Sequence, residues 1–355
     1  MKRESRKIQT IFKPLLDFYR SSEFRNFIIQ RSQARLGCTK LWATPIVLQI
    51  EFTNRCNLKC ATCGHSHWDK DANKGRFLDL DLLPKVESFY QRASEILIGG
   101  YGEPSLHPQF DQLIDHFRRV PHKKLVMISN GLLLQKKWES LRKLNQLILS
   151  LDGVEDVYEK HRGVSFQKLR ENLDFYRENR GEQRFEWNVV WNRSTHQNLR
   201  EVVDLANEYE VDQINLLPEK MYSSVREQEC LFLPEELHSL HLEIQRLRTK
   251  FRGNLNSPSF LRDEIPCNQP LETMFILSNG EVMACCSAIF HGNPYRFSLG
   301  NLSTQSLDEL WNHPKMVQFR LARLKGDREQ YPEPCQDCAF RSVRHDRLKR
   351  PLLKS

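Results

Sequence analysis

Three cysteines stand close together near the start of the chain, at the spacing C-x3-C-x2-C: Cys56, Cys60 and Cys63. Clustered cysteines in a reducing compartment indicate metal binding or catalysis more than disulfides. A structural zinc ion needs four ligands, so His65 or His67 would have to complete the set. A four-iron cluster held by only three thiolates leaves one iron open to a ligand. The spacing therefore predicts an open [4Fe–4S] cluster, with a zinc site as the alternative.

A second set of cysteines lies nearer the C-terminus: Cys267, Cys285, Cys335 and Cys338. Four thiolates suit a fully ligated [4Fe–4S] cluster that transfers electrons, and they also suit a structural four-cysteine zinc site. Cys286 adjoins Cys285 and could replace it as the ligand. The sequence therefore predicts a second, closed metal site.

The composition predicts a globular protein of the cytoplasm, with 39% hydrophobic and 28% charged residues. No apolar run approaches the roughly 20 residues of a membrane span, and no apolar segment follows the basic first residues as in a signal peptide. The net charge of +8 is concentrated at the two ends. Residues 1–45 hold ten Lys or Arg and three acidic residues, and residues 339–355 hold six and one. These ends are either simply solvated, or they bind an anionic surface, an acidic partner or nucleic acid.

Apolar, β-branched segments alternate with segments of helical periodicity over the first two thirds of the chain. The predicted strands cover residues 46–52, 95–100, 124–130, 146–153, 185–192 and 212–218. The predicted helices between them cover residues 79–93, 107–120, 166–179 and 198–210. This alternation predicts an α/β fold with parallel strands and right-handed crossovers, a partial (β/α)6 barrel of the TIM type. Active sites of such sheets lie at the carboxyl ends of the strands, which is where the three-cysteine loop begins.

The sequence predicts a hairpin near the C-terminal end and divides the chain into five segments. The stretch "MFILSNGEVMACC" predicts a hairpin beyond the barrel, with its turn at Asn279-Gly280. The segments are a basic N-terminal helical segment (1–45), the barrel core (46–230), a helical linker (231–260), a small cluster-binding domain (261–340) and a basic tail (341–355).

Motifs after successive strands resemble those of radical S-adenosylmethionine (SAM) enzymes. C-x3-C-x2-C after the first strand is the hallmark spacing of that superfamily. "GYGEP" (100–104) resembles its Gly-Gly-Glu-Pro motif, "MISNG" (127–131) its Thr-Asn-Gly, and "LSLDG" (149–153) its Ser-x-Asp-Gly. "KHRG" (160–163) resembles the Arg-Gly that often follows. The resemblance covers about residues 46–220.

The resemblance implies that the open iron binds the amino and carboxylate groups of SAM. One electron then cleaves the sulfonium, and the 5′-deoxyadenosyl radical takes a hydrogen atom from a substrate. The residues that the resemblance assigns to cofactor binding are Gly100, Gly102, Glu103, Asn130, Ser150, Asp152, Arg162 and Asn192. One position departs from the family: the residue before the third cysteine is usually aromatic and lies against adenine, and here it is Thr62.

The C-terminal cysteines resemble those of the SPASM domain, because Gly280 and Cys285 form its Gly-x4-Cys pattern. No cysteine follows Cys338, which is typical of the shortened "twitch" version with a single auxiliary [4Fe–4S] cluster. The resemblance therefore implies that Cys267, Cys285, Cys335 and Cys338 hold this auxiliary cluster.

An auxiliary cluster could accept an electron from a substrate radical, so we expect a net oxidation of a polar small molecule or a sugar-like alcohol. A peptide- or protein-modifying enzyme is the alternative, and a non-catalytic metal-cluster protein that binds nucleic acid is a weaker one. Either enzyme would need an electron donor such as flavodoxin or ferredoxin. Candidate substrate-pocket residues at strand ends are His65, His67, Trp68, Tyr101, Glu219 and Lys220.

Overall fold

The computed structural model describes residues 21–68, 75–120, 123–219, 232, 236–257, 267–286, 293–326 and 330–331. Within these residues the strands form one ten-stranded sheet in the order β10-β9-β8-β1-β2-β3-β4-β5-β6-β7. The strands are β1 (Val47–Ile50), β2 (Glu95–Ile98), β3 (Lys124–Ser129), β4 (Gln146–Ser150), β5 (Arg184–Trp191), β6 (Gln213–Pro218), β7 (Asn254–Asn256), β8 (Thr273–Ile276), β9 (Glu281–Met283) and β10 (Ser298–Asn301).

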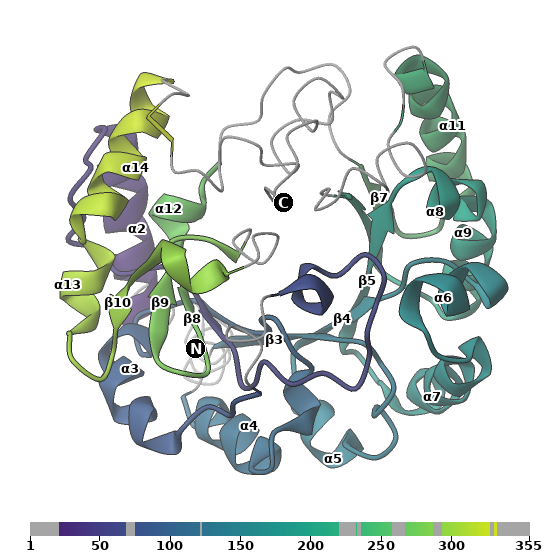
Figure 1. Ribbon diagram of the computed structural model, residues 1–355, viewed down its shortest axis with the longest axis horizontal. Coiled ribbons are helices and arrows are strands. Elements are labelled where there is room, and N and C mark those ends of the chain that lie inside the picture. Colours follow the sequence, from purple (N-terminus) through teal and green to yellow (C-terminus); the bar gives the residue numbers. More distant parts are fainter. Residues whose placement is uncertain are drawn as a thin grey trace, which may run out of the picture.

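Helices cover the outer face of this curved sheet, as Figure 1 shows. The helices of the barrel half are α3 (Leu83–Tyr90), α4 (Phe110–Arg118), α5 (Trp138–Leu141), α6 (Glu155–Arg162), α7 (Phe166–Asn179), α8 (Arg193–Gln197), α9 (Leu199–Glu208) and α11 (Leu237–Lys250). The remaining helices are α2 (Ser22–Arg35), α12 (Gln269–Glu272), α13 (Leu307–Trp311) and α14 (Pro314–Lys325), and short 3-10 turns are η1 (Gly64–His67), η2 (Leu80–Leu82), η3 (Pro104–Leu106) and η7 (Pro294–Phe297).

The predicted alternation of strands and helices is confirmed, and so is the α/β barrel. Each of β1 to β6 pairs in parallel with the next. The strands are buried between the helices and the barrel interior, which explains their nearly continuous apolar sequences. The helices α4 and α9 turn an apolar stripe inward, which in α4 consists of Phe110, Leu113, Ile114 and Phe117. The parallel arrangement brings the carboxyl ends of all six strands to one edge of the sheet.

The sheet extends beyond the six predicted strands at both edges. β7 pairs in parallel with β6, so part of the predicted linker 231–260 adds a strand to the barrel. β8 pairs in parallel with β1, with Val47 opposite Thr273 and Ile50 opposite Ile276. β9 and β10 continue the sheet in antiparallel orientation, and the predicted hairpin turn is confirmed between β8 and β9. Short three- or four-residue strands joined to a larger sheet give little local signal, which is why β7 and the pairing of β8 were not predicted.

Helix α2 turns its polar residues toward the barrel. The side chain of Asn26 bonds both backbone groups of Thr44, and Gln33 Oε1 accepts from the amides of Trp42 and Ala43. Gln30, fully buried, donates to the carbonyl of Leu271 at 3.0 Å. These side chains satisfy backbone groups of the segments before β1 and β8, so α2 fastens the start of the barrel to the C-terminal unit.

A buried ion pair completes the contact of α2 with the barrel. Lys123 Nζ lies 2.6 Å from Glu23 Oε1 and from the carbonyl oxygens of Gln91 and Ala93, so its three N–H donors all have acceptors. Burial raises the pKa of Glu23, but the hydrogen bond and charge of Lys123, together with hydrogen bonds from the backbone and from Ser21, lower it by more, and the net shift is downward. The pair therefore stabilises the fold at neutral pH, and this stabilisation is lost as the pH falls through the folded-state pKa of Glu23.

We expect Glu23→Gln to lower the free energy of unfolding by about 3 kcal/mol, because it leaves the buried ammonium of Lys123 without its counter-charge. Glu95→Gln is the matched control, since Glu95 pairs at 3.0 Å with the half-exposed Lys124. Glu95→Gln should lower the free energy of unfolding by less than about 1 kcal/mol. Urea unfolding of both variants checks the difference, and equal midpoints would contradict the importance of the buried pair.

Candidate active site

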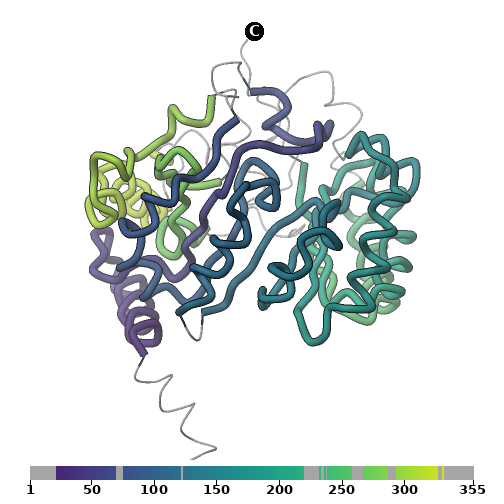
Figure 2. Tube along the Cα trace, turned by 90° about the horizontal axis from the view of Figure 1, so that it is seen from below, coloured from purple at the N-terminus to yellow at the C-terminus, as the bar shows by residue number. Residues whose placement is uncertain are grey.

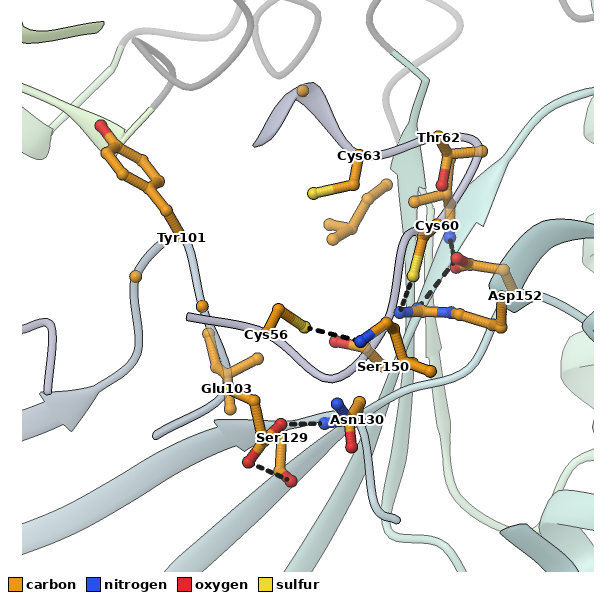
Figure 3. Close-up of a pocket in the computed structure, with 18 residues that line it drawn as sticks. Cys56, Cys60, Thr62, Cys63, Tyr101, Glu103, Ser129, Asn130, Ser150 and Asp152 are labelled. Carbon is orange, nitrogen blue, oxygen red and sulfur yellow. Dashed lines mark hydrogen bonds and ion pairs between the residues drawn. The ribbon is translucent and has the colours of Figure 1, made fainter. Parts of the chain in front are cut away.

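A cavity of about 290 Å³ opens at the carboxyl ends of the barrel strands. Figure 3 shows its walls: the cysteine loop after β1, the glycine loop after β2, and the ends of β3 and β4. The residues that line it are Cys56, Leu58, Cys60, Thr62, Cys63, Gly64, Gly100, Tyr101, Gly102, Glu103, Ile128, Ser129, Asn130, Ser150, Asp152, Arg162, Val190 and Leu217. All three cysteines predicted to act together therefore share one cavity.

The cysteine loop is held by backbone contacts on both sides. The amide of Ala61 donates to the carbonyl of His161 at the end of α6, and the amide of Glu103 donates to the carbonyl of Arg55. The amide of Leu58 lies 3.4 Å from Cys56 Sγ and donates to it. The loop is therefore fixed against the ends of β2 and α6 by the chain itself.

Cys60 is buried and Cys56 and Cys63 are half-buried, a setting that suits metal binding. Burial raises the pKa of Cys56 to about 11 and that of Cys63 to about 12, so without a cation both side chains stay protonated at neutral pH. Burial also raises the pKa of Cys60, although Arg162 opposes this shift. A metal centre that takes three thiolate ligands supplies the positive charge that such groups need. The donor set thus fits a cluster with three thiolate ligands.

The geometry gives no support to the zinc alternative. In the described part of the chain, no three His, Cys, Asp or Glu side chains gather closely enough to hold a single metal ion. His65, a proposed fourth ligand, packs its ring edge-on against Trp68 at 4.6 Å, and burial lowers its pKa.

The glycine loop approaches the cysteine loop so closely that two positions exclude any side chain. A Cβ atom on Gly102 would lie 2.5 Å from the carbonyl oxygen of Thr53 and would also collide with that of Arg55. A Cβ atom on Gly100 would lie 2.5 to 2.6 Å from the side chain of Glu51. Both glycines are therefore required by the contact of the two loops.

Glu103 lies at the bottom of the cavity, fixed by the end of β3. Its Oε1 accepts from the hydroxyls of Ser105 (2.6 Å) and Ser129 (3.1 Å), and its Oε2 accepts from the amide of Asn130 (2.8 Å). Burial raises the pKa of Glu103, while these hydrogen bonds oppose the shift. Asn130 in turn donates to the side chain of Asn57 at 2.7 Å. The arrangement gives the cavity wall a fixed carboxyl group, which is directed toward Ser129 and Asn130 at the end of β3 (Figure 3).

On the other wall, Asp152 and Arg162 form a buried ion pair beside Cys60. Arg162 Nη2 lies 2.8 Å from Asp152 Oδ2, and Arg162 Nη1 donates to Cys60 Sγ at 3.6 Å. Asp152 Oδ1 accepts from the amide of Val190 at 2.8 Å, which fixes the carboxylate to β5. Burial lowers the pKa of Arg162, but Asp152, Cys60 and Tyr158 together raise it by more, so the guanidinium stays charged. Ser150, at the end of β4, lines the same wall.

One predicted cofactor residue lies elsewhere. Asn192 is fully buried behind the cavity wall, where its side chain accepts from the amide of Thr195 and caps α8. Its Nδ2 also donates to Glu219 at 2.6 Å. The structure thus brings together seven of the eight predicted cofactor residues and leaves Asn192 with a capping contact.

The structure adds cavity residues that were not among the predicted site residues, among them Ile128 and Ser129, which lie within the "MISNG" motif, and Val190 and Leu217, which lie outside all the motifs. All four lie near the carboxyl ends of β3, β5 and β6, so their position at a strand end was the available signal. Thr62 is buried and lines the cavity, at the place where an aromatic side chain was expected.

Tyr101 connects the cavity to the C-terminal unit. It lines the cavity, and its ring packs edge-on against Trp68 (4.7 Å) and Phe275 (5.5 Å). The same apolar cluster includes Met283 and the half-buried Cys286. In Figure 3 the hydroxyl of Tyr101 points away from Cys56 and toward the C-terminal unit. Cys267 and Cys285 are both half-buried, and Cys335, Cys338 and Lys220 lie outside the described residues.

Comparison with known proteins defines the class to which this fold and site belong. The family model described as "Radical SAM superfamily" matches residues 50–206, and that described as "Iron-sulfur cluster-binding domain" (SPASM) matches residues 267–339. The protein is thus a radical SAM enzyme with a SPASM domain. The chain belongs to the radical SAM superfamily, and its cofactors are a [4Fe–4S] cluster, SAM and auxiliary iron–sulfur clusters.

Two curated relatives match along most of their length. The tungsten-containing aldehyde ferredoxin oxidoreductase cofactor-modifying protein of Pyrococcus furiosus is 27% identical over 336 residues, 83% of this chain and 88% of the relative. The antilisterial bacteriocin subtilosin biosynthesis protein AlbA of Bacillus subtilis is 24% identical over 341 residues, which cover 86% of this chain and 70% of AlbA.

Solved structures share the fold. Streptococcus suis SuiB bound to S-adenosylmethionine aligns with a TM-score of 0.62 at 17% identity, over 85% of this chain and 78% of that one. The structure of anSMEcpe with bound AdoMet aligns with a TM-score of 0.61 at 16% identity, over 85% of this chain and 93% of that one. No helix of the described residues is both long and apolar enough to cross a membrane.

Proposed function

We propose that Cys56, Cys60 and Cys63 hold the [4Fe–4S] cluster and that SAM binds in the cavity beside it. The observation that supports this best is the convergence of three thiols, the two-glycine loop and two fixed polar groups on one cavity. When bound, the reduced cluster supplies the electron that cleaves SAM, and the resulting 5′-deoxyadenosyl radical removes a hydrogen atom from the substrate.

The residues of the chain hold SAM in a fixed orientation. Because Gly100 and Gly102 have no side chains, the glycine loop packs directly against Glu51 and the cysteine loop, which fixes it beside the methionine part. The carboxyl of Glu103 faces the position of its amino group, and the charged Arg162 with Ser150 faces that of its carboxylate. Opposite charges fixed at the two ends bind SAM in one direction only. We leave Asn192 out of this set because it lies behind the wall.

A sharp test is anaerobic incubation of the iron-loaded protein with dithionite and SAM. Formation of 5′-deoxyadenosine, detected by mass spectrometry, is expected. Absence of this product in a protein with both metal sites loaded would contradict the proposal.

For the substrate we propose a net oxidation of a polar small molecule, with the auxiliary cluster as electron acceptor. The support is the domain order: a SPASM domain whose sheet continues the barrel, with Tyr101 in contact with both. A second candidate, modification of a peptide, is favoured by two similar proteins: AlbA acts in bacteriocin biosynthesis, and SuiB has been solved with its precursor peptide SuiA.

Deuterium transfer separates the two candidates. A panel of deuterated polyols and a panel of deuterated peptides are incubated with the active enzyme, and deuterium in 5′-deoxyadenosine is measured. Enrichment with polyols supports the oxidation of a small molecule, and enrichment with peptides alone supports peptide modification.

We also propose that Cys267, Cys285, Cys335 and Cys338 hold the auxiliary cluster. Cys335→Ala/Cys338→Ala should keep 5′-deoxyadenosine formation but lose most substrate oxidation, because the substrate radical then lacks its acceptor. Metal binding also stabilises such domains, so circular dichroism must show that the variant is folded. It should retain about four irons per chain against about eight in the parent, as two four-iron clusters require. Substrate oxidation at the parent rate in a folded variant would contradict the acceptor role.

A further inference from the structure

Helix α2 exposes apolar side chains on the face that should be polar. Ile28 and Ile29 are 46% and 45% exposed, and Leu36, just past the helix end, is 80% exposed. The opposite face buries Asn26 and Gln30, as described above. A helix packed on a barrel normally shows the reverse distribution, with apolar residues inward. The exposed apolar residues therefore need an explanation outside the barrel.

The exposed apolar surface extends beyond the helix. Trp42 is 86% exposed, and Leu324 of α14 lies beside Gly37, with its methyl groups 3.8 to 3.9 Å from the position of a Cβ there. We call the exposed residues Ile28, Ile29, Leu36 and Trp42 the α2 face. Ile28 and Ile29 lie on one helix, Leu36 is its C-cap and Trp42 follows six residues later, and several exposed apolar residues on one segment, unlike single ones, mark an interaction surface.

The exposed charged residues of α2 itself are positive, and one of them, Arg31, is paired with Glu272 of α12. Arg25, Arg31, Arg35 and Lys40 are exposed, while Glu23, the acidic residue of α2, is buried against Lys123. Residues 1–20, which lead into the helix, contain six Lys or Arg and two acidic residues. The α2 face therefore combines aliphatic side chains and an exposed tryptophan with a cationic border.

We propose that the α2 face docks the protein on an anionic lipid surface. Helices at a membrane interface insert aliphatic and tryptophan side chains at the headgroup level, while Lys and Arg attract anionic lipids. A flat anionic surface fits an exposed helix face on which Arg25, Arg35 and Lys40 are exposed cations and, among the described residues, only Arg31 is paired with an acidic residue. In Figure 2 α2 lies at the lower left, and the loop after β1 crosses the upper part of the view, so docking leaves the active-site end directed away from the lipid.

Vesicle co-sedimentation of the full-length, iron-loaded protein tests this proposal. The protein should bind vesicles of phosphatidylcholine and phosphatidylglycerol in equal parts, and it should bind pure phosphatidylcholine far less. Binding should fall at high salt, because the Debye length drops from about 10 Å at 0.1 M to about 3 Å at 1 M. The double variant Ile28→Ser/Ile29→Ser should partition about tenfold less, since its aliphatic groups no longer insert.

Leu242→Ser is the matched control, because Leu242 is also 46% exposed but lies on α11, on the other side of the barrel (Figure 1). It should bind vesicles as the parent does, and both variants should keep the parent melting temperature. Equal binding by the α2 and α11 variants overturns the proposal. So does a dimer that the α2 variant dissociates while vesicles are never bound, since the face would then join two copies. Failure to bind after deletion of residues 1–20 alone, with the α2 variant unaffected, also overturns it.

A second inference concerns the ion pair beside Cys60, and it rests on the proposed function. We infer that Arg162 is a positioning residue that raises the reduction potential of the cluster held by Cys60. Its guanidinium is 9% exposed and donates to Cys60 Sγ at 3.6 Å, and Asp152 fixes its orientation. Hydrogen bonds to cluster sulfurs and nearby positive charge both favour the reduced, more negative state.

The midpoint potential of the loaded enzyme, measured without SAM by electron paramagnetic resonance, tests this role. Arg162→Gln/Asp152→Asn replaces the pair with neutral groups of similar shape, so no buried charge is left unpaired. The midpoint potential of this double variant should lie ~59 mV or more below that of the parent, which is a tenfold change in the redox equilibrium of a one-electron couple. Arg162→Lys keeps the positive charge, so its midpoint potential should fall by less than that of the double variant.

Arg180→Gln is the control, because Arg180 pairs with Asp212 at 3.7 Å away from the cavity. Its midpoint should equal that of the parent. An unchanged midpoint in the double variant overturns the role of Arg162. A parent enzyme that shows no reducible cluster when its three cysteines are present would instead contradict the proposed function, so the two failures are distinguishable.

Discussion

Replacement of Cys56, Cys60 and Cys63 together by alanine abolishes formation of 5′-deoxyadenosine, and iron at the C-terminal site remains. This is the expected result because the three thiols line one cavity and are the proposed ligands of the SAM-binding cluster. Loss of the cluster removes both the electron and the open iron, so no residual cleavage of SAM is expected. Iron content and 5′-deoxyadenosine, measured on the same anaerobic preparation, check the prediction.

Cys38→Ala is the matched control, since Cys38 is half-buried against the core and does not line the cavity. It should cleave SAM at the parent rate. Any 5′-deoxyadenosine above background from the triple variant would show that these cysteines do not hold the catalytic cluster.

Gly102→Ala should reduce SAM cleavage by about 10²-fold, the loss that follows when reacting groups are displaced by about 1 Å. The added methyl group would lie 2.5 Å from the backbone oxygen of Thr53 and 2.6 Å from the backbone carbon of Asn54. Backbone cannot rotate away as a side chain can, so the cysteine loop and the glycine loop must separate. Initial rates of 5′-deoxyadenosine formation at saturating SAM measure the effect.

Gly99→Ala serves as its control, because it is the same change three residues earlier. Its added Cβ would meet only the side chain of Ile128, at 3.3 Å. Only a small loss in the rate of SAM cleavage is expected in Gly99→Ala. If both variants cleave SAM equally well, close contact between the two loops is not what positions the cofactor.

The barrel could be predicted because its signals are local. The strands from β1 to β6 combine apolar runs with turn residues at their ends, and the helices between them have clear periodicity. β7 could not be predicted, because Asn254–Asn256 is a short polar strand that exists only by pairing with β6. The pairing of β8 with β1 joins residues more than two hundred positions apart, and nothing in either segment specifies that partner.

The candidate site, like the fold, could be predicted from the sequence only in part. The spacing of Cys56, Cys60 and Cys63 predicted that they act together, because strand order places their loop at the active end. Asn192 shows the limit of motif reasoning, since its position after β5 fitted a cofactor residue but its side chain caps α8. The contact of Arg162 with Cys60 could not be read from the sequence, because it depends on how α6 packs against the cysteine loop.

The hydrogen-bonded joint between β1 and β8 has a consequence for exchanging parts between enzymes. Because the two strands pair in register over four residues, the SPASM unit is an extension of the barrel sheet and cannot swing as a tethered body. Glu51, at the end of β1, accepts from the amide of Tyr101 (2.7 Å) and the hydroxyl of Ser278 (2.7 Å), which fixes the same joint at the active end. A chimera that grafts a foreign C-terminal unit onto this barrel must therefore match the edge of β1 residue by residue, and a flexible linker cannot replace that fit.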